Sequence, residues 1–287
     1  MPQCDACFRR CKIEEGATGF CGARACRGGK IVADNYGKLT ALALDPIEKK
    51  PLKMFMPGKM VLSVGSYGCN LRCPFCQNSG ISWSQEAFDY KDTAERYSPQ
   101  ELVQSALALR GRGNIGLAFT YNEPLVGWEF VRDAAKLCKE AGMKNVLVTN
   151  GTASLKVLQE IKPCIDAMNI DLKSFSENFY KDFIGGDLRM TKDFIRGALD
   201  SCHVELTTLI IPGKNDSDEE MRSLAAWVAG LEKEFGKKIP LHITRFFPRF
   251  KFADCDPTPV SKIRRLVDVA KERWNLSLRG MCKEGAK

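Results

Sequence analysis

The chain has 287 residues, of which 44% are hydrophobic, enough for one large domain or for such a domain with a small appendage. It has no run of 18 apolar residues, which argues against a transmembrane helix, and residues 1–10 lack the apolar stretch of a secretory signal, so we expect a cytoplasmic protein. The net charge of +8 is spread along the chain, which is weak evidence for nucleic-acid binding and fits an acidic protein partner such as an electron carrier.

Cysteines dominate the N-terminus. The chain has 13 of them, a number that in a reducing compartment points to metal ligation or redox chemistry rather than to disulfides. Five fall in the first 26 residues, and four of these form a candidate ligand set: Cys4, Cys7, Cys11 and Cys21. Four thiolates can close a structural zinc site or ligate an auxiliary [4Fe–4S] cluster completely, and the spacing does not separate the two. We predict that residues 1–30 form a metal-binding appendage, stabilised by its metal because it is too short for a core of its own.

The rest of the chain is predicted to contain a linker and a core domain. Residues 31–59 are turn-rich and are expected to form an extended linker to a domain over residues 60–287. In that domain, short apolar runs alternate with amphipathic stretches of helical length, which is typical of repeated βα units. The predicted strands are 61–66, 115–121, 145–149, 167–172, 204–211 and 241–245. The predicted fold class is α/β: a partial (β/α)6 TIM-like barrel of parallel strands with a small cysteine-rich N-terminal appendage.

Local signals place three of the helices between these strands. Ser98 and Glu101 have the spacing of a capping box, which predicts a helix start at that point. Residues 216–219 are a second plausible start, after a glycine turn. In the segment 125–141, Cys138 shares a stripe with apolar residues, so we expect it to pack in the core rather than to bind a metal.

A loop after the first strand, residues 65–80, carries three more cysteines in eight positions: Cys69, Cys73 and Cys76. In barrels of this kind the chemistry lies at the C-terminal ends of the strands. Three thiolates bind three irons of a [4Fe–4S] cube and leave the fourth iron open for a substrate or cofactor. Catalytic zinc also uses three protein ligands, but three cysteines packed so closely are an unusual zinc set. The spacing therefore favours a cluster with an open iron over zinc and over cysteines that pack as small apolar side chains.

The loop sequence CNLRCPFC resembles the CxxxCxΦC motif of the radical S-adenosylmethionine (SAM) enzymes, with the aromatic Phe75 before the last cysteine. The resemblance implies that the open iron binds the amino and carboxylate groups of SAM and that Phe75 packs near the adenine. It also implies that one electron from the cluster breaks a C–S bond of SAM, and that the resulting 5′-deoxyadenosyl radical abstracts a hydrogen from the substrate.

Further motifs follow the strands. TYNEP (120–124) lies where the superfamily has its glycine-glutamate motif, and VTNG (148–151) and NIDLKSF (169–175) resemble motifs of the pyruvate formate-lyase activating enzymes in the same superfamily. The resemblance assigns Asn122 and Glu123 to the SAM amino group and Lys173 to its carboxylate, both suited to charge-assisted hydrogen bonds. His242 matches a histidine that approaches the ribose, although a core histidine fits equally well. The implied cofactor-binding residues are Phe75, Asn122, Glu123, Asn150, Gly151, Asp171, Lys173 and His242, and no catalytic residue is assigned beyond the cluster and SAM.

A finer resemblance covers almost the whole chain. The N-terminal cysteines together with DPIEKKPL (45–52), TTLIIPGKNDSDEE (207–220) and TRFFP (244–248) resemble the radical enzyme of the AmmeMemoRadiSam system. This resemblance implies Memo-like and AMMECR-like partner proteins, and the superfamily implies a flavodoxin- or ferredoxin-type electron donor.

Three hypotheses for function follow. The leading one is a radical SAM enzyme that abstracts hydrogen from an unidentified substrate, with protein partners. The second, in the same class, is activation of a glycyl-radical enzyme. The third is a zinc-bearing nucleic-acid or protein-binding module, suggested by the N-terminal cysteines and the positive charge. It leaves unexplained why the motifs follow predicted strands, so we expect neither a nucleic-acid nor a membrane partner.

Overall fold

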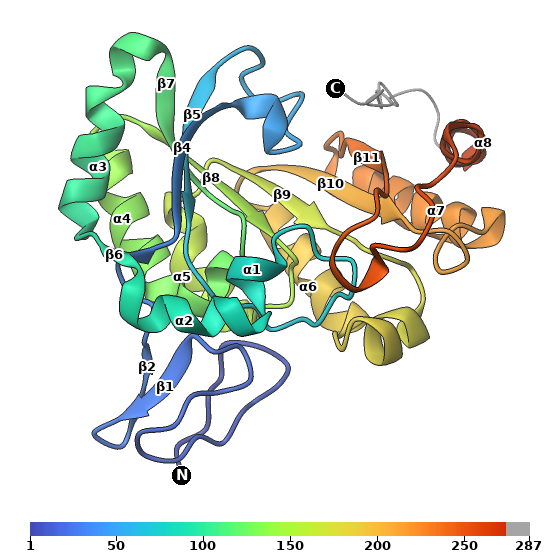
Figure 1. The fold of residues 1–287 in the computed structure, drawn as a ribbon. Helices are drawn as coiled ribbons and strands as arrows, with labels where there is room; N and C mark the ends of the chain where they lie inside the picture. Colours follow the sequence, from blue (N-terminus) through green and yellow to red (C-terminus); the bar gives the residue numbers. More distant parts are fainter. Residues whose placement is uncertain (274–287) are drawn as a thin grey trace.

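The central element of the structure is a seven-stranded sheet in the order β11-β10-β9-β8-β7-β5-β4 (Figure 1). The computed structural model describes residues 1–273, so the end of the predicted core domain, residues 274–287, lies outside the described part. Six strands are parallel: β5 (Met60–Gly65), β7 (Asn114–Phe119), β8 (Lys144–Thr149), β9 (Ala167–Asp171), β10 (His203–Ile210) and β11 (Leu241–Arg245). They follow one another in chain order across the sheet, as expected for a partial (β/α)6 barrel. The predicted fold class and all six predicted strands are confirmed.

Helices connect these strands, because parallel neighbours require a crossover. The helices along the sheet are α3 (Pro99–Ala108), α4 (Trp128–Glu140), α5 (Leu155–Ile161), α6 (Leu188–Leu199), α7 (Asp218–Phe235) and α8 (Val260–Arg273). Figure 1 shows α3 and α4 along one side of the sheet and α7 and α8 beside its other end. The loop after β5 adds two more helices, α1 (Ser79–Ser82) and α2 (Gln85–Thr93).

The local helix signals hold in the structure. Ser98 Oγ accepts a hydrogen bond from Glu101 N (3.2 Å), and a Glu101 carboxylate oxygen accepts one from Ser98 N (2.7 Å), which completes the capping box of α3. Helix α7 begins at Asp218, with Ser217 as its N-cap. Cys138 is fully buried in α4, as predicted.

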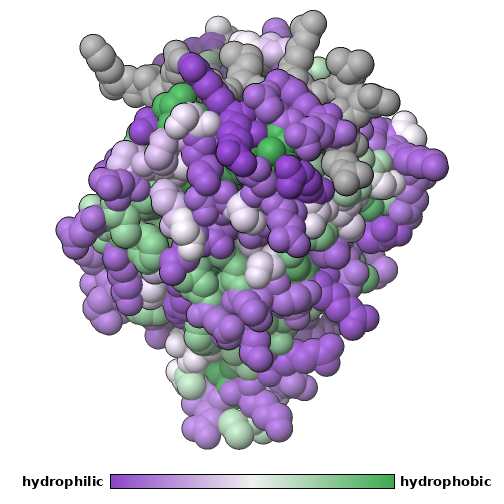
Figure 2. All heavy atoms as spheres, turned by 90° about the vertical axis from the view of Figure 1, so that its right-hand side faces the viewer, coloured by the Kyte–Doolittle hydropathy of each residue, from purple (hydrophilic) through white to green (hydrophobic). Residues whose placement is uncertain are grey.

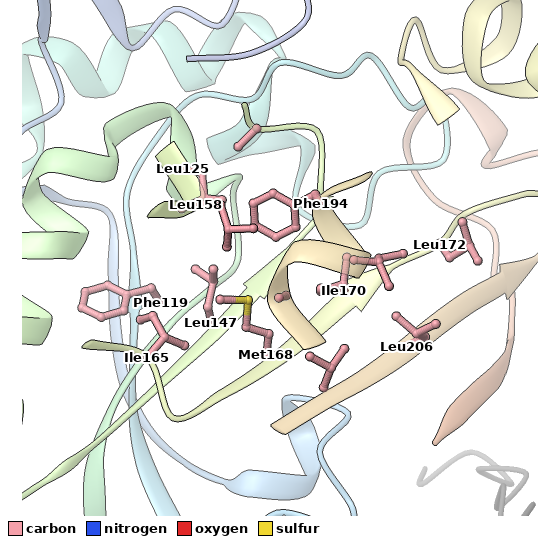
Figure 3. Packing of buried hydrophobic residues seen from close by; sticks show 14 of the residues in the cluster. Phe119, Leu125, Leu147, Leu158, Ile165, Met168, Ile170, Leu172, Phe194 and Leu206 are labelled. Carbon is pink, nitrogen blue, oxygen red and sulfur yellow. The ribbon is translucent and has the colours of Figure 1, made fainter. Parts of the chain in front are cut away.

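The main hydrophobic core lies between the sheet and these helices. Leu147, Met168 and Ile170 of neighbouring strands face Leu158 of α5 and Phe194 of α6 in Figure 3. Each of these side chains is almost completely buried, and burial of one such side chain stabilises a fold by roughly 1.5–3 kcal/mol. This packing fixes the strand ends from which the candidate site is built.

The opposite face of the sheet is the inside of the barrel, and residues 31–59 close part of it. Strand β4 (Ala41–Pro46) pairs antiparallel with β5, and β3 (Lys38–Leu39) pairs with β6 (Glu95–Arg96). Ile47 and Leu52 pack on small apolar side chains of the strands, and the N–H groups of Lys53 and Met54 donate to Glu205 of β10 (3.0 and 2.8 Å). The segment predicted as an extended linker therefore contains strands and covers part of the inside of the barrel. The division of the chain into domains stays a prediction.

The N-terminal appendage packs against the loops that follow the parallel strands. Its regular part is the hairpin of β1 (Arg24–Arg27) and β2 (Lys30–Ala33), and Figure 1 shows the whole segment beneath α1 and α2. Cys69 N donates to Cys21 O (3.2 Å), and Ser154 N donates to Ala6 O (2.8 Å). Two of the motif-bearing loops are thus fastened directly to the appendage.

Within residues 1–273, no helix is long and apolar enough to cross a membrane. Hydrophilic residues cover most of the face seen in Figure 2, and apolar residues gather mainly in its middle and lower parts.

Candidate active site

The three cysteines of the CxxxCxxC motif lie in the loop after β5. Cys73 is buried, and Cys69 and Cys76 are half-buried. Leu71 N donates to Cys69 Sγ (3.4 Å), and Asn150 Nδ2 donates to the same sulfur (3.8 Å). Burial raises the pKa of the Cys73 thiol to about 12, so this thiol stays protonated at neutral pH until a metal binds it.

The surroundings of these thiols suit an iron–sulfur cluster. In the described part of the chain, no three His, Cys, Asp or Glu side chains are grouped so that they could hold one metal ion. A zinc ion draws its thiolates to about 2.3 Å, whereas a four-iron cube lies between thiolates that bind different irons. The N–H donors at the sulfur of Cys69 also suit an anionic cluster, whose potential such bonds tune.

Glu123 lies beside this loop and is buried. Its two oxygens accept hydrogen bonds from Thr149 Oγ1 (2.7 Å), Leu125 N (3.1 Å) and Asn150 N (2.7 Å). Burial raises the pKa of Glu123 to about 7, because these three donors only partly offset the loss of water. The carboxylate thus keeps unsatisfied affinity for a positively charged or hydrogen-bonding group.

Asn122 and Tyr121 hold the loop rather than reach beyond it. Asn122 Oδ1 accepts from Ser66 N (3.1 Å), and its Nδ2 donates to Gly68 O (3.1 Å). Tyr121 has φ +75°, a strained conformation for a tyrosine, and its carbonyl accepts from Asn78 Nδ2 (2.8 Å). The predicted contact of Asn122 with SAM stays a prediction, and the structure shows that this side chain positions the cluster loop.

Asn150 and Gly151 shape the turn after β8. Asn150 Nδ2 donates to Asn70 Oδ1 (2.9 Å) as well as to Cys69 Sγ, so this residue joins β8 to the cluster loop. Gly151 has φ +69°, and a Cβ there would lie 2.9 Å from Ile170 Cγ2. A glycine is therefore required where the chain turns past β9.

Asp171 and Lys173 form an ion pair at the end of β9. Lys173 Nζ lies 2.8 Å from Asp171 Oδ2, and both side chains are partly exposed. Burial lowers the pKa of Lys173, but the charge of Asp171 and the hydrogen bond to it raise the pKa more, so the ammonium stays charged. A cation is thereby held close to the cluster cysteines, where it can pair with a carboxylate.

Phe75, the aromatic residue of the motif, is buried against Phe183, with ring centroids 5.8 Å apart. Phe183 belongs to a π-helical turn, Phe179–Phe183, and Tyr180 of the same turn accepts a hydrogen bond from Lys173 N (3.1 Å). The sequence analysis missed these aromatic residues, and only the row of aromatics between 175 and 183 could have indicated them. Turns of this type are frequent at functional sites.

His242 is fixed inside the barrel. Its Nε2 lies 2.6 Å from Glu205 Oε2, and His203 Nε2 lies 2.9 Å from the other oxygen of the same carboxylate. Burial raises the pKa of Glu205, but the bonds from both histidines and from two backbone N–H groups lower it to about 2. In the sheet register, His242 stands level with Thr207 and Asp171, so it belongs to the row of the Asp171–Lys173 pair. A role at the ribose stays a prediction.

The four N-terminal cysteines of the predicted ligand set line one cavity together: Cys4, Cys7, Cys11 and Cys21. Asn70 of the cluster loop lines the same cavity. The cavity therefore lies next to the CxxxCxxC site. Cys26, the fifth cysteine of the appendage, does not line it and instead donates to Glu15 Oε2 (3.4 Å).

Comparison with protein families identifies a family match over the part of the chain that contains this site. The Radical SAM superfamily matches residues 63–227, which is more than half of the chain. The chain therefore belongs to the radical SAM superfamily, a family that binds an iron–sulfur cluster and SAM.

Individual relatives narrow the relationship. An uncharacterized protein of Methanocaldococcus jannaschii is 36% identical over 280 residues, which cover 94% of this chain and 78% of that protein. The pyruvate formate-lyase-activating enzyme of Clostridium pasteurianum is 28% identical over 181 residues, 61% of this chain and 72% of that enzyme. The predicted relation to the pyruvate formate-lyase activating enzymes is thus confirmed.

A solved structure shares the fold. The structure of Streptococcus suis SuiB bound to S-adenosylmethionine matches with a TM-score of 0.55 over 72% of this chain and 45% of SuiB. The sequence identity of 11% means that this likeness shows the fold alone.

Proposed function

We propose that this protein holds a [4Fe–4S] cluster with an open iron through Cys69, Cys73 and Cys76, and cleaves SAM reductively to abstract hydrogen from a substrate. When bound, the cluster supplies the electron for cleavage of the C–S bond. The observation that carries the proposal is that a carboxylate, an ammonium group and three thiols, from separate strand ends, meet around one loop. Membership of the superfamily favours this enzyme over the zinc-bearing binding module.

The residues of the chain have separate tasks in this function. Glu123 accepts hydrogen bonds from the amino group of SAM, because its buried carboxylate gains from an additional donor. Lys173, kept charged by Asp171, pairs with the SAM carboxylate. Phe75 is locked by Phe183 and provides an apolar surface for the adenine. Together these side chains orient SAM at the open iron and exclude water from it.

The finer assignment, to the AmmeMemoRadiSam system, draws support from the motif DPIEKKPL. Asp45 of this motif accepts hydrogen bonds from Lys50 Nζ (2.9 Å), Ser63 Oγ (2.9 Å) and Tyr121 OH (2.8 Å). The motif is thereby joined both to β5 and to the strained residue before Asn122. We infer that Memo-like and AMMECR-like proteins act with this enzyme, and co-purification of tagged protein with both candidates would test this.

Activation of a glycyl-radical enzyme is a second candidate, favoured by the similarity to the clostridial activating enzyme. It predicts a glycyl signal by electron paramagnetic resonance after incubation with a glycyl-radical enzyme, SAM and a reductant. The electron donor in either case is a flavodoxin or ferredoxin, and docking of an acidic carrier fits the net charge of +8.

The experiment that tests the proposed function is anaerobic turnover of SAM. The wild-type protein with dithionite should form 5′-deoxyadenosine, and the triple variant C69A/C73A/C76A should form none. The matched control is Cys255→Ala, because Cys255 is exposed and outside both cysteine sets. Formation of 5′-deoxyadenosine by the triple variant at the wild-type rate would refute the ligand assignment.

A further inference from the structure

The N-terminal cysteines are the second group of metal-ligating side chains in the described residues, and the superfamily assignment does not account for them. Residues 1–26 lie before the matched region, which begins at residue 63. The backbone of the appendage gathers these cysteines from both ends of the segment. Cys4 N donates to Cys11 O (2.9 Å), and Arg10, with φ +43°, closes a turn by donating from its N–H to Cys7 O (3.3 Å).

The wall of the cavity between the four thiols contains a hydrogen-bond donor that has no acceptor. Arg24 lines the cavity and is 5% exposed. Its NH1 group donates to both oxygens of Glu129 (2.7 and 2.6 Å), but its Nε has no hydrogen-bond partner among the described residues. A buried donor without an acceptor is costly, by about 1–3 kcal/mol. An anionic group in the cavity would supply that acceptor.

The way the thiols are grouped favours a cluster over zinc. Four cysteines closed on zinc stand around one point at about 2.3 Å from the metal. No three metal-ligating side chains of residues 1–273 are grouped in that way, and instead the four thiols line a shared cavity. Among the same residues, the CxxxCxxC cysteines likewise belong to no group that could hold a single ion. Ligands that line a shared space suit a cube that binds one iron to each thiolate.

We propose that Cys4, Cys7, Cys11 and Cys21 hold a second [4Fe–4S] cluster, with all four irons ligated by cysteine, directly beside the SAM cluster. Because no iron is left open, this cluster binds no SAM. Arg9 and Arg24 line its cavity, and the Nε of Arg24 can donate to it while NH1 of Arg24 stays paired with Glu129.

The second cluster braces the loop of the first one. Cys21 O accepts from Cys69 N, so a ligand of one cluster is one hydrogen bond away from a ligand of the other (3.2 Å). Gly68 makes this approach possible, because a Cβ at its φ of +95° would lie 2.7 Å from Cys21 O. Asn70 lines the second cavity and accepts from Asn150, which reaches Cys69 Sγ.

Metal analysis of the full-length protein, purified anaerobically without reconstitution, tests the proposal. We expect about eight irons per wild-type chain and about four in C69A/C73A/C76A, with the absorption of a [4Fe–4S] cluster retained in that variant. The variant C7A/C11A should keep about four irons and the ability to cleave SAM at a low rate. The matched control is Cys26→Ala, a cysteine of the same appendage that does not line the cavity, which should keep about eight irons.

The outcomes separate the two sites. About one zinc and four irons per wild-type chain, or loss of all iron from C69A/C73A/C76A, would overturn the second cluster. Retention of about eight irons in C69A/C73A/C76A would instead overturn the proposed SAM cluster. If C7A/C11A does not fold, the wild-type protein and C69A/C73A/C76A still decide the question, because both keep the N-terminal cysteines intact.

Discussion

Replacement of Glu123 by Gln should raise the stability of the fold above neutral pH relative to wild type and should weaken the binding of SAM, because the same carboxylate is costly to bury and useful for binding. The pKa of this group rises from an ordinary 4.5 to about 7 in the folded protein. A carboxyl with a raised folded-state pKa contributes stability that is complete below pH 4.5 and is lost as the pH rises through about 7. The loss amounts to about 3 kcal/mol over the whole range and to about 1.4 kcal/mol between pH 6 and pH 8.5.

Glutamine does not titrate, so it removes this pH dependence. The free energy of unfolding of Glu123→Gln should therefore rise by about 1.4 kcal/mol relative to wild type between pH 6 and pH 8.5. The free energy of unfolding of the variant at any one pH also includes a clash between the new amide group and one of the backbone N–H donors, and this cost does not vary with pH. Urea unfolding of both proteins at the two pH values measures the difference.

Binding of SAM should change in the opposite direction. A hydrogen bond to a charged group contributes roughly 1.5–3 kcal/mol, so its loss should weaken SAM binding at pH 8 by roughly 10- to 150-fold. Equilibrium dialysis under anaerobic conditions gives the affinity. The reasoning is refuted if Glu123→Gln binds SAM as tightly as wild type and its stability difference is the same at both pH values.

Three further changes test the supports of the site. Gly68→Ala forces a side chain into a left-handed backbone position against the appendage and should lower the free energy of unfolding by roughly 1–3 kcal/mol. Gly111→Ala, which has open space around it, should not lower it. Equal effects of the two substitutions would contradict the close approach at Gly68. Asp45→Asn breaks a buried ion pair and should cost about 3–5 kcal/mol in urea unfolding. Lys49→Ala removes a 62% exposed partner of the same carboxylate and should cost less than about 1 kcal/mol, so a larger loss from Lys49→Ala would be evidence against the buried pair. Glu205→Gln should lose about 3 kcal/mol at pH 7 and match wild type progressively as the pH falls from 4.5 toward 2, because the pKa of Glu205 is lowered to about 2; a difference that does not vary with pH would show that the charge is not responsible.

The sequence predicted the strands and the cluster loop well because both depend on local patterns. Each parallel strand is a short apolar run, and the motif cysteines follow the first of them directly. The capping box of α3 is local too, since Ser98 and Glu101 satisfy each other's N–H groups within one turn. Features of this kind need no knowledge of distant contacts.

The parts that could not be predicted depend on contacts between distant segments. Residues 41–46 became a strand of the sheet because β5 offered a free edge, and nothing within the segment identifies that partner. Glu205 binds backbone N–H groups about 150 positions earlier in the chain, and Phe183 meets Phe75 through a π-helical turn. The hydrogen bonds of the Asn122 side chain to the backbone of the cluster loop join positions 56 and 54 residues apart, so no local pattern indicates them, while its contact with the cofactor stays a prediction.

The open iron of the first cluster is the central claim, and electron paramagnetic resonance of the reduced protein tests it most directly. Addition of SAM to the dithionite-reduced wild-type protein should shift the signal of one cluster, because SAM binds its open iron. The variant C69A/C73A/C76A should lose the SAM-sensitive signal and keep that of the N-terminal cluster. A wild-type spectrum that SAM leaves unchanged would contradict the account.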